Sequence, residues 1–139
     1  MSLCFLSLES SKVFNKLIYK NIKEAGFDGL SEALIVIFPY IEVSEKSTTA
    51  QLSKQLGYSR QAMHKHIKKL DELGYITLAL ENQKEKIIQL TQKGQELIAI
   101  ANRSIIEIES KLSALIGKEE LDVYKKNQIK IYDCLESLN

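Results

Sequence analysis

The segment from Thr48 to Leu73 constrains the fold of this 139-residue chain more than any other. It begins with Thr-Thr-Ala-Gln, which fits a capping box with Thr48 as N-cap, so a short helix is expected to run from there to the residue before Gly57. Gly57 ends that helix. Ser59 is a good N-cap for a second helix, which is expected to continue to Leu73 and to end at Gly74. Two helices separated by such a short turn predict a helix-turn-helix.

The hydrophobic period changes after Gly74, from about 3.6 residues to 2. In residues 75–80, Ile and Leu alternate with other side chains, which is typical of a β-strand, and residues 85–90 predict a second strand. The segment Glu81-Asn-Gln-Lys84 lies between them and is expected to form the turn. A β-hairpin is therefore predicted directly after the helix-turn-helix.

Further helices are predicted on both sides of these elements. Residues 11–25 place apolar side chains at helical spacing before a glycine, and residues 30–38 form an apolar segment that Pro39 is expected to end or kink. After the hairpin, residues 91–116 carry apolar side chains at alternating steps of three and four, and residues 118–138 carry another apolar stripe. The expected fold class is mainly α with a small β-hairpin wing.

Composition and charge exclude several classes of protein. Hydrophobic residues make up 45% of the chain, enough for a core, and no apolar run approaches the roughly 18 residues that a transmembrane helix needs. The N-terminus lacks the basic region and cleavage pattern of a signal peptide, so a cytoplasmic protein without membrane contact is expected. Cys4 and Cys134 fit neither a metal-type spacing nor a disulfide framework and are expected to be reduced. With a net charge of +1, any binding of a polyanion must come from local clustering of charge.

The two histidines, His64 and His66, predict neither a metal site nor a catalytic site. On an intact helix their imidazoles point about 160° apart and cannot bind one metal together. No nearby Cys, Asp or Glu supplies the missing ligands, and the chain has no GxSxG motif, Gly-rich loop or acid pair typical of an enzyme. His66 falls within the apolar arc of the helix as a partly buried structural residue, whereas His64 faces outward. We expect no enzymatic activity, no cofactor and no metal.

Charge is distributed unevenly around the helix-turn-helix. From Ser47 to Leu70 there are five basic residues and no acidic one, in a chain that is 27% charged and nearly balanced. The second helix also carries Gln61 and His64, which can hydrogen-bond base edges, and Arg60 near its N-terminus, where recognition helices meet the major groove. These cations either keep an exposed helix face in water or bind DNA, and the combined pattern favours DNA. Base readout is expected from Arg60, Gln61, His64 and Lys65, and further DNA contacts, mainly to phosphates, from Thr48, Thr49, Lys54, Ser59, Lys68 and Lys69.

Three strings are similar to the MarR family of bacterial winged-helix transcription factors: Thr49-Ala-Gln-Leu-Ser-Lys-Gln-Leu-Gly-Tyr-Ser59, Leu70-Asp-Glu-Leu-Gly-Tyr-Ile76 and Leu90-Thr-Gln-Lys-Gly-Gln-Glu-Leu97. The Leu-Thr-x-Lys-Gly at the start of the third string is the most specific of them. The resemblance covers essentially the whole chain and implies a single MarR-like domain over residues 1–139. Within it, residues 30–92 would form the winged helix-turn-helix lobe, and residues 1–29 and 93–139 the dimerisation helices.

The same resemblance implies a function. Members of the family are homodimers that read palindromic operators in double-stranded DNA, so this chain is expected to be a repressor that a small-molecule inducer releases. The apolar stripes of the first and last helices agree with a dimer, since one lobe of this size could not cover them. Alternatively, these stripes fold back within one chain. A winged-helix protein-interaction module without sequence-specific DNA binding is the other functional class.

The expected wing departs from the family pattern. Many members carry Asp-x-Arg before the second strand, where this chain has Asn82-Gln-Lys84 and a shorter turn. A lysine ammonium is more strongly hydrated than a guanidinium and suits a narrow minor groove less well. Lys84 and Lys86 are therefore expected to bind phosphate with little selection of sequence.

Two regulatory sites are also implied by the resemblance. In the family, phenolic or other lipophilic compounds often bind between the dimerisation helices and the DNA lobe. Four aromatic residues lie in segments that could line such a site unless they are plain core residues: Tyr19, Phe27, Phe38 and Tyr40. Cys4 of one subunit could also pair with Cys134 of the other on oxidation, as in peroxide-sensing members. Neither thiol has a basic neighbour to activate it, so inert thiols are the alternative.

Overall fold

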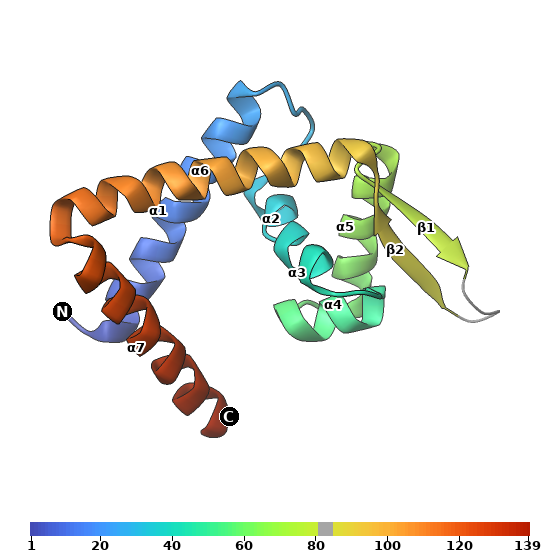
Figure 1. Ribbon diagram of the computed structural model, residues 1–139. Coiled ribbons are helices and arrows are strands. Elements are labelled where there is room, and N and C mark those ends of the chain that lie inside the picture. Colours follow the sequence, from blue (N-terminus) through green and yellow to red (C-terminus); the bar gives the residue numbers. More distant parts are fainter. Residues whose placement is uncertain (81–84) are drawn as a thin grey trace. The chain divides into compact units, whose positions relative to one another are not determined.

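The computed structural model describes residues 1–80 and 85–139, and Figure 1 shows it as a ribbon. The described chain divides into two units, Met1–Asn102 and Arg103–Asn139. Helices dominate both units, and the strands of the described residues form one two-stranded antiparallel sheet in the first unit. The expected fold class, mainly α with a β-hairpin, is confirmed.

Helix α1 spans Leu3–Glu24 and begins earlier than the helix predicted at residues 11–25. Ser2 explains the earlier start, because its hydroxyl accepts a hydrogen bond of 3.1 Å from an amide in the first turn and so caps the helix. The predicted end is confirmed, since Gly26 has a φ of 94° and its amide donates to a carbonyl of the last turn at 3.1 Å. Of the 22 residues of α1, only Ile22 is buried.

The prediction of one apolar helix at residues 30–38 is wrong. The chain forms two short helices there, α2 (Glu32–Ile35) and α3 (Phe38–Val43), and Pro39 stands in the first turn of α3 instead of ending a helix. Proline is tolerated at this place because the amide that it lacks would have no helical partner. Ile37, between the two helices, is fully buried.

The predicted helix-turn-helix is confirmed as α4 (Thr49–Leu56) and α5 (Arg60–Glu72). At the start of α4 the Thr48 hydroxyl accepts from the Gln51 amide at 3.2 Å, and the Gln51 side chain accepts from the Thr48 amide at 3.3 Å. Both halves of the capping box are therefore present. Gly57 follows α4 with a φ of 73°. The apolar side of each helix is buried in the core through Leu52, Met63, Ile67 and Leu70.

The predicted hairpin consists of β1 (Ile76–Leu80) and β2 (Lys86–Leu90), which pair antiparallel. β2 has a second neighbour, because the Ile88 amide donates to the Ser47 carbonyl at 2.8 Å. The residue that precedes the cap of α4 thus joins the sheet. The predicted alternation fails at the outer end of β1, where Leu80 is 69% exposed. The outer part of the hairpin extends beyond the helices of its unit (Figure 1) and has no core to face.

Tyr75 lies elsewhere than its place in the predicted alternation suggests. Tyr75 and its neighbour Ile76 are both buried, although successive strand residues point to opposite faces. Tyr75 precedes β1 and is the largest fully buried side chain among the described residues. Its ring meets that of Phe38 edge-on at a centroid distance of 5.8 Å, and its hydroxyl donates to the Asp28 carbonyl at 3.2 Å. The core of the first unit therefore includes the turn between α5 and β1.

Helix α6 (Gln92–Ile116) runs from the first unit into the second, and Gly117 separates it from α7 (Lys118–Ser137). Both predicted C-terminal helices are confirmed. Within the second unit the Lys125 ammonium donates a hydrogen bond to the Glu109 carboxylate. This hydrogen bond and the charge of Glu109 raise the pKa of Lys125. None of the helices described has both the length and the apolar character needed to cross a membrane.

Candidate nucleic-acid interface

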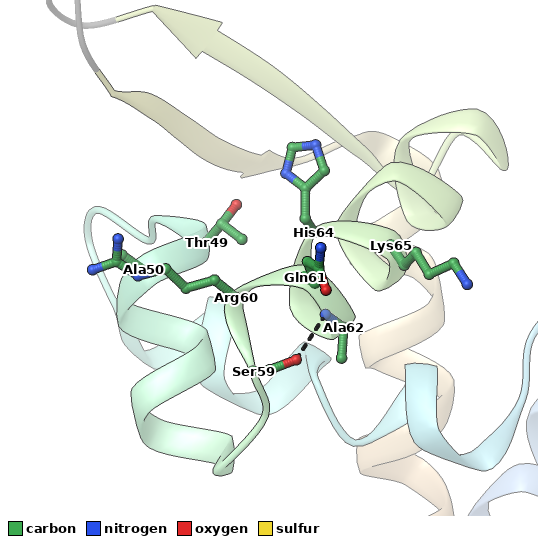
Figure 2. Close-up of a pocket in the computed structure, with 8 residues that line it drawn as sticks. All are labelled: Thr49, Ala50, Ser59, Arg60, Gln61, Ala62, His64 and Lys65. Carbon is green, nitrogen blue, oxygen red and sulfur yellow. Dashed lines mark hydrogen bonds between the residues drawn. The ribbon is translucent and has the colours of Figure 1, made fainter.

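Helix α5 presents one apolar and one basic side. Every third or fourth residue from Met63 onward is buried, which leaves the cationic side chains exposed. The four residues predicted to read bases, Arg60, Gln61, His64 and Lys65, line one hollow together with Thr49, Ala50, Ser59 and Ala62. In Figure 2 the Arg60 side chain extends towards the start of α4, while His64 and Lys65 leave the helix in different directions. The first two turns of α5 thus spread donors and acceptors over a broad surface.

The N-terminus of α5 adds to the positive character of this hollow. Ser59 caps the helix through its hydroxyl, which accepts from the Ala62 amide at 3.1 Å (Figure 2). The first turn contains no acidic residue. The partial positive charge of its free amides therefore adds to the charge of the Arg60 guanidinium. The Ser59 hydroxyl still has its own proton to donate, so the cap does not prevent the predicted DNA contact.

A second hollow lies beside the first, between α4 and β2. It brings together Lys46, Lys54 and Arg60, three cations that are separated in sequence, with the capping residues of α4. Arg60 lines both hollows and so connects them. Glu85 lines the second hollow as well and lowers its net positive charge. The arrangement suits a phosphate better than a base edge, since ammonium groups and a helix start bind anions without regard to sequence.

Lys46 is a candidate that the sequence did not indicate. It precedes the acid-free stretch that begins at Ser47 and follows Glu45, so it looks like part of a neutral pair. Only the pairing of Ser47 with Ile88 of β2 brings Lys46 beside Lys54. No local pattern in the sequence could have shown this, because the pairing joins residues that are 41 positions apart.

The remaining predicted DNA contacts lie outside these two hollows. Lys68 and Lys69 are exposed further along α5, with Lys69 in its last turn. Lys86 is exposed at the start of β2. Lys84 lies outside the described residues, so its predicted contact stays a prediction from sequence.

The two histidines differ as the helical spacing predicted. His64 is exposed in the first hollow, whereas His66 is half-buried and meets the Tyr58 ring edge-on at a centroid distance of 5.1 Å. Tyr58 comes from the turn between α4 and α5. His66 thus packs α5 against the turn that precedes it, and of the two histidines His64 is the one exposed to a ligand.

The four aromatic residues suggested for a small-molecule site belong to the core packing of the first unit. Phe38 is buried in the core, and the other three pack against it as partly buried side chains. The Tyr19 hydroxyl donates to the Leu30 carbonyl at 3.2 Å. A ligand would have to displace or join this packing, and the ligand role of Tyr19, Phe27, Phe38 and Tyr40 stays a prediction. Cys4 in α1 and Cys134 in α7 are exposed free thiols.

A capped helix-turn-helix, an antiparallel hairpin and an exposed basic second helix define the class of this protein: it is a winged-helix protein of the DNA-binding type. The family described as the winged helix DNA-binding domain matches residues 35–104, and the chain belongs to that family. The family is one of DNA-binding modules, which agrees with the prediction that the protein is not an enzyme. No curated protein sequence matches the chain.

Solved structures show the same fold over nearly the whole chain. The oxidised form of MarR from E. coli is 15% identical with a TM-score of 0.77, and the match covers 95% of both chains. A MarR/EmrR family transcriptional regulator from Acinetobacter sp. ADP1 is 24% identical with a TM-score of 0.66 and 96% of both chains covered. The F27L mutant of S. aureus MepR, bound to an oligodeoxyribonucleotide, is 17% identical with a TM-score of 0.63, covering 97% of this chain and 99% of its own. The resemblance to the MarR family is thus confirmed at the level of the fold.

Proposed function

We propose that this protein is a homodimeric transcription regulator that represses by binding a palindromic operator in double-stranded DNA and is released by a small ligand. The observation that carries the proposal is the hollow at the start of α5, where Arg60, Gln61, His64 and Lys65 are exposed together. Arginine can bind the O6 and N7 atoms of guanine with two hydrogen bonds, and glutamine the N6 and N7 atoms of adenine. A surface built from these side chains suits the major groove.

The second hollow would fix the position of α5 on the duplex. Lys46 and Lys54 would bind phosphates next to the start of α4, and Lys68 and Lys69 would extend the phosphate contacts along α5. Such contacts carry no sequence information but make affinity depend on salt, with about 0.9 in the logarithmic slope for each phosphate neutralised. The MepR structure with a bound oligodeoxyribonucleotide supports DNA as the partner class.

The apolar surface of α1 supports a dimer. Leu3, Phe5, Leu6 and Leu8 are each about half exposed, between 47% and 53%, although α1 is 22 residues long. Tyr124, Ile129 and Leu135 of α7 are exposed by a similar fraction. Apolar patches of this kind are typical of interfaces between chains. In the proposal, residues 1–29 and 93–139 interlock two subunits and place two copies of α5 in major grooves one helical turn apart.

The dimer has a direct test. Phe5→Glu and Leu6→Glu introduce charge into the proposed interface and are expected to convert the dimer into a monomer in light scattering after gel filtration. Val43→Glu is the matched control, since Val43 is 81% exposed on α3 and lies outside the segments 1–29 and 93–139. A monomeric wild-type protein at micromolar concentration would contradict the dimer.

The DNA function is tested by a fluorescence-anisotropy titration against the duplex upstream of the protein's own gene and against a scrambled duplex, at low and near-physiological salt. We expect tight binding to the natural duplex at physiological salt and weak, salt-sensitive binding to the scrambled one. Arg60→Ala is expected to reduce this preference, and Lys20→Ala, at an exposed lysine of α1, is the matched control. Equal weak binding to both duplexes, lost as salt rises, would favour a protein-interaction module instead.

A further inference from the structure

The Leu-Thr-x-Lys-Gly string has a structural role at the end of α5. The Lys93 ammonium donates a hydrogen bond of 2.9 Å to the carbonyl of Leu73, the C-cap residue of α5. The same ammonium lies 4.4 Å from the centroid of the Tyr75 ring, within the range of a cation–π contact. A cation at a helix C-terminus also interacts favourably with the helix dipole. Lys93 of α6 therefore holds the end of α5.

Two neighbours of Lys93 contact the same turn. The Thr91 hydroxyl donates to the Gly74 carbonyl at 2.7 Å, and the Thr91 amide donates to the Tyr75 carbonyl at 3.1 Å. Gly94 packs so closely that a Cβ atom there would lie 2.3 Å from the Tyr75 carbonyl oxygen. Thr91, Lys93 and Gly94 thus contact three consecutive residues, 73–75. We name these six residues the α5–α6 junction.

The loop after α1 contacts the junction as well. The Asp28 carbonyl accepts from the Tyr75 hydroxyl, and the Phe27 and Tyr75 ring centroids are 6.3 Å apart. A Cβ atom on Gly29 would lie 2.6 Å from a methyl group of Leu73, so this loop also packs tightly. Burial and the charge of Asp28 raise the pKa of Tyr75, which keeps its hydroxyl a hydrogen-bond donor. The end of α5 is therefore fixed by segments that continue into α1 and α6.

The junction and the DNA-reading residues lie at opposite ends of one rigid helix. With 13 residues in α5, Leu73 and Arg60 are separated by about 20 Å. Over this length, a small tilt of α5 about residue 73 displaces the Arg60 side chain far enough to break its contact with a base. β1 begins at the residue after Tyr75, so the position of the hairpin depends on the same junction.

We propose that Lys93 is a positioning residue for DNA recognition: it sets the orientation of α5 relative to α6 and the loop after α1, without touching DNA. The proposal rests on the proposed DNA-binding function. Through these contacts, a change in α1 or α6, such as an inducer would cause, would alter the orientation of the recognition helix. An ammonium that makes one hydrogen bond and one ring contact can be withdrawn without unfolding the core.

The test compares Lys93→Met, which keeps the length of the side chain and removes its charge, with Lys93→Arg, which keeps both the donor and the ring contact. Lys111→Met removes an exposed charge from the same helix as a control, and light scattering after gel filtration is used to compare the oligomeric state of each variant with that of the wild type. The amides of Gly74 and Tyr75, which donate to α5 carbonyls at 3.0 Å, are followed by hydrogen exchange without DNA. Affinity for the upstream duplex is measured well below the unfolding temperature of every variant.

For Lys93→Met we expect faster hydrogen exchange at both amides. With about a tenth of the molecules keeping α5 in the binding orientation, the apparent dissociation constant for DNA rises about tenfold. The salt slope stays unchanged because no phosphate contact is lost. For Lys93→Arg we expect the exchange rates and the DNA affinity of the wild type. Wild-type exchange and affinity in Lys93→Met would overturn the proposal, and so would a slope reduced by about one, which would place Lys93 on a phosphate. Wild-type protein without specific DNA binding would refute the proposed function, while the exchange measurement would still test the junction.

Discussion

The substitution Gly94→Ala tests the close packing of the α5–α6 junction. Gly94 is buried in the first turn of α6. A Cβ atom at this position would lie 2.3 Å from the Tyr75 carbonyl oxygen and 3.1 Å from a methyl group of Leu90. Leu90 can move its side chain, but the first contact is with the backbone and cannot be relieved by rotation of a side chain.

Three contributions decide the change in the free energy of unfolding, one stabilising and two destabilising. Alanine in place of glycine in a helix stabilises a protein by about 1 kcal/mol. Moving the Tyr75 carbonyl away breaks its hydrogen bond with the Thr91 amide, which costs about 1 kcal/mol. Inserting a methyl group into a packed contact costs a further amount of about 1–3 kcal/mol. We therefore expect Gly94→Ala to lower the free energy of unfolding by about 1–3 kcal/mol.

Urea unfolding followed by circular dichroism measures this difference, at one protein concentration for all variants. Ala99→Gly makes the reverse exchange at an exposed position of the same helix and measures the helix-propensity effect by itself. A Gly94→Ala protein that is as stable as wild type, with an unchanged denaturant slope, would refute the reasoning, because propensity alone would then account for the result.

Three further outcomes are expected. Arg60→Ala should reduce discrimination against a wrong base pair by about 1–3 kcal/mol, whereas Lys54→Ala should weaken binding to all duplexes and reduce the salt slope by about one; competition titrations with single-base operator variants separate the two. The raised pKa of Tyr75 means that the folded state holds the phenolic proton more tightly than the unfolded state. The contribution of this proton to the free energy of unfolding is therefore fully present below pH 10.0 and is lost as pH rises through the folded pKa. Urea titrations between neutral and strongly alkaline pH should show a smaller alkaline loss in Tyr75→Phe, and an equal loss would rule out this tyrosine. Peroxide should leave the chain monomeric on a non-reducing gel, because neither Cys4 nor Cys134 has a basic residue next to it in the sequence; a dimer band that Cys4→Ser abolishes would show the opposite.

The order of the elements could be predicted because their ends are encoded locally. The capping box at Thr48 and Gln51, the cap at Ser59 and the glycines after α1, α4, α5 and α6 act over three or four residues. The same holds for the basic side of α5, since helical spacing alone separates Arg60 and His64 from Met63. The exposed basic side of α5 was therefore predictable from the sequence.

Local signals misled where packing chose between permitted structures. Pro39 is compatible both with the end of a helix and with the first turn of the next one, and the burial of Ile37 and Phe38 decided for the second. Tyr75 follows the period of a strand, yet it is buried because Phe38 and the Asp28 carbonyl surround it. Neither neighbour lies close to Tyr75 in sequence.

By itself, the sequence determined the helix-turn-helix, the hairpin and the two C-terminal helices, and also which helix carries the basic side, because these features depend on residues within one or two turns of each other. Only the tertiary structure decided that Lys46 joins Lys54 and Arg60 in one hollow and that Lys93 holds the end of α5. Lys93 and Leu73 are 20 residues apart, and no periodicity relates them. Their contact exists because the hairpin reverses the chain and the buried Tyr75 fixes where α6 begins.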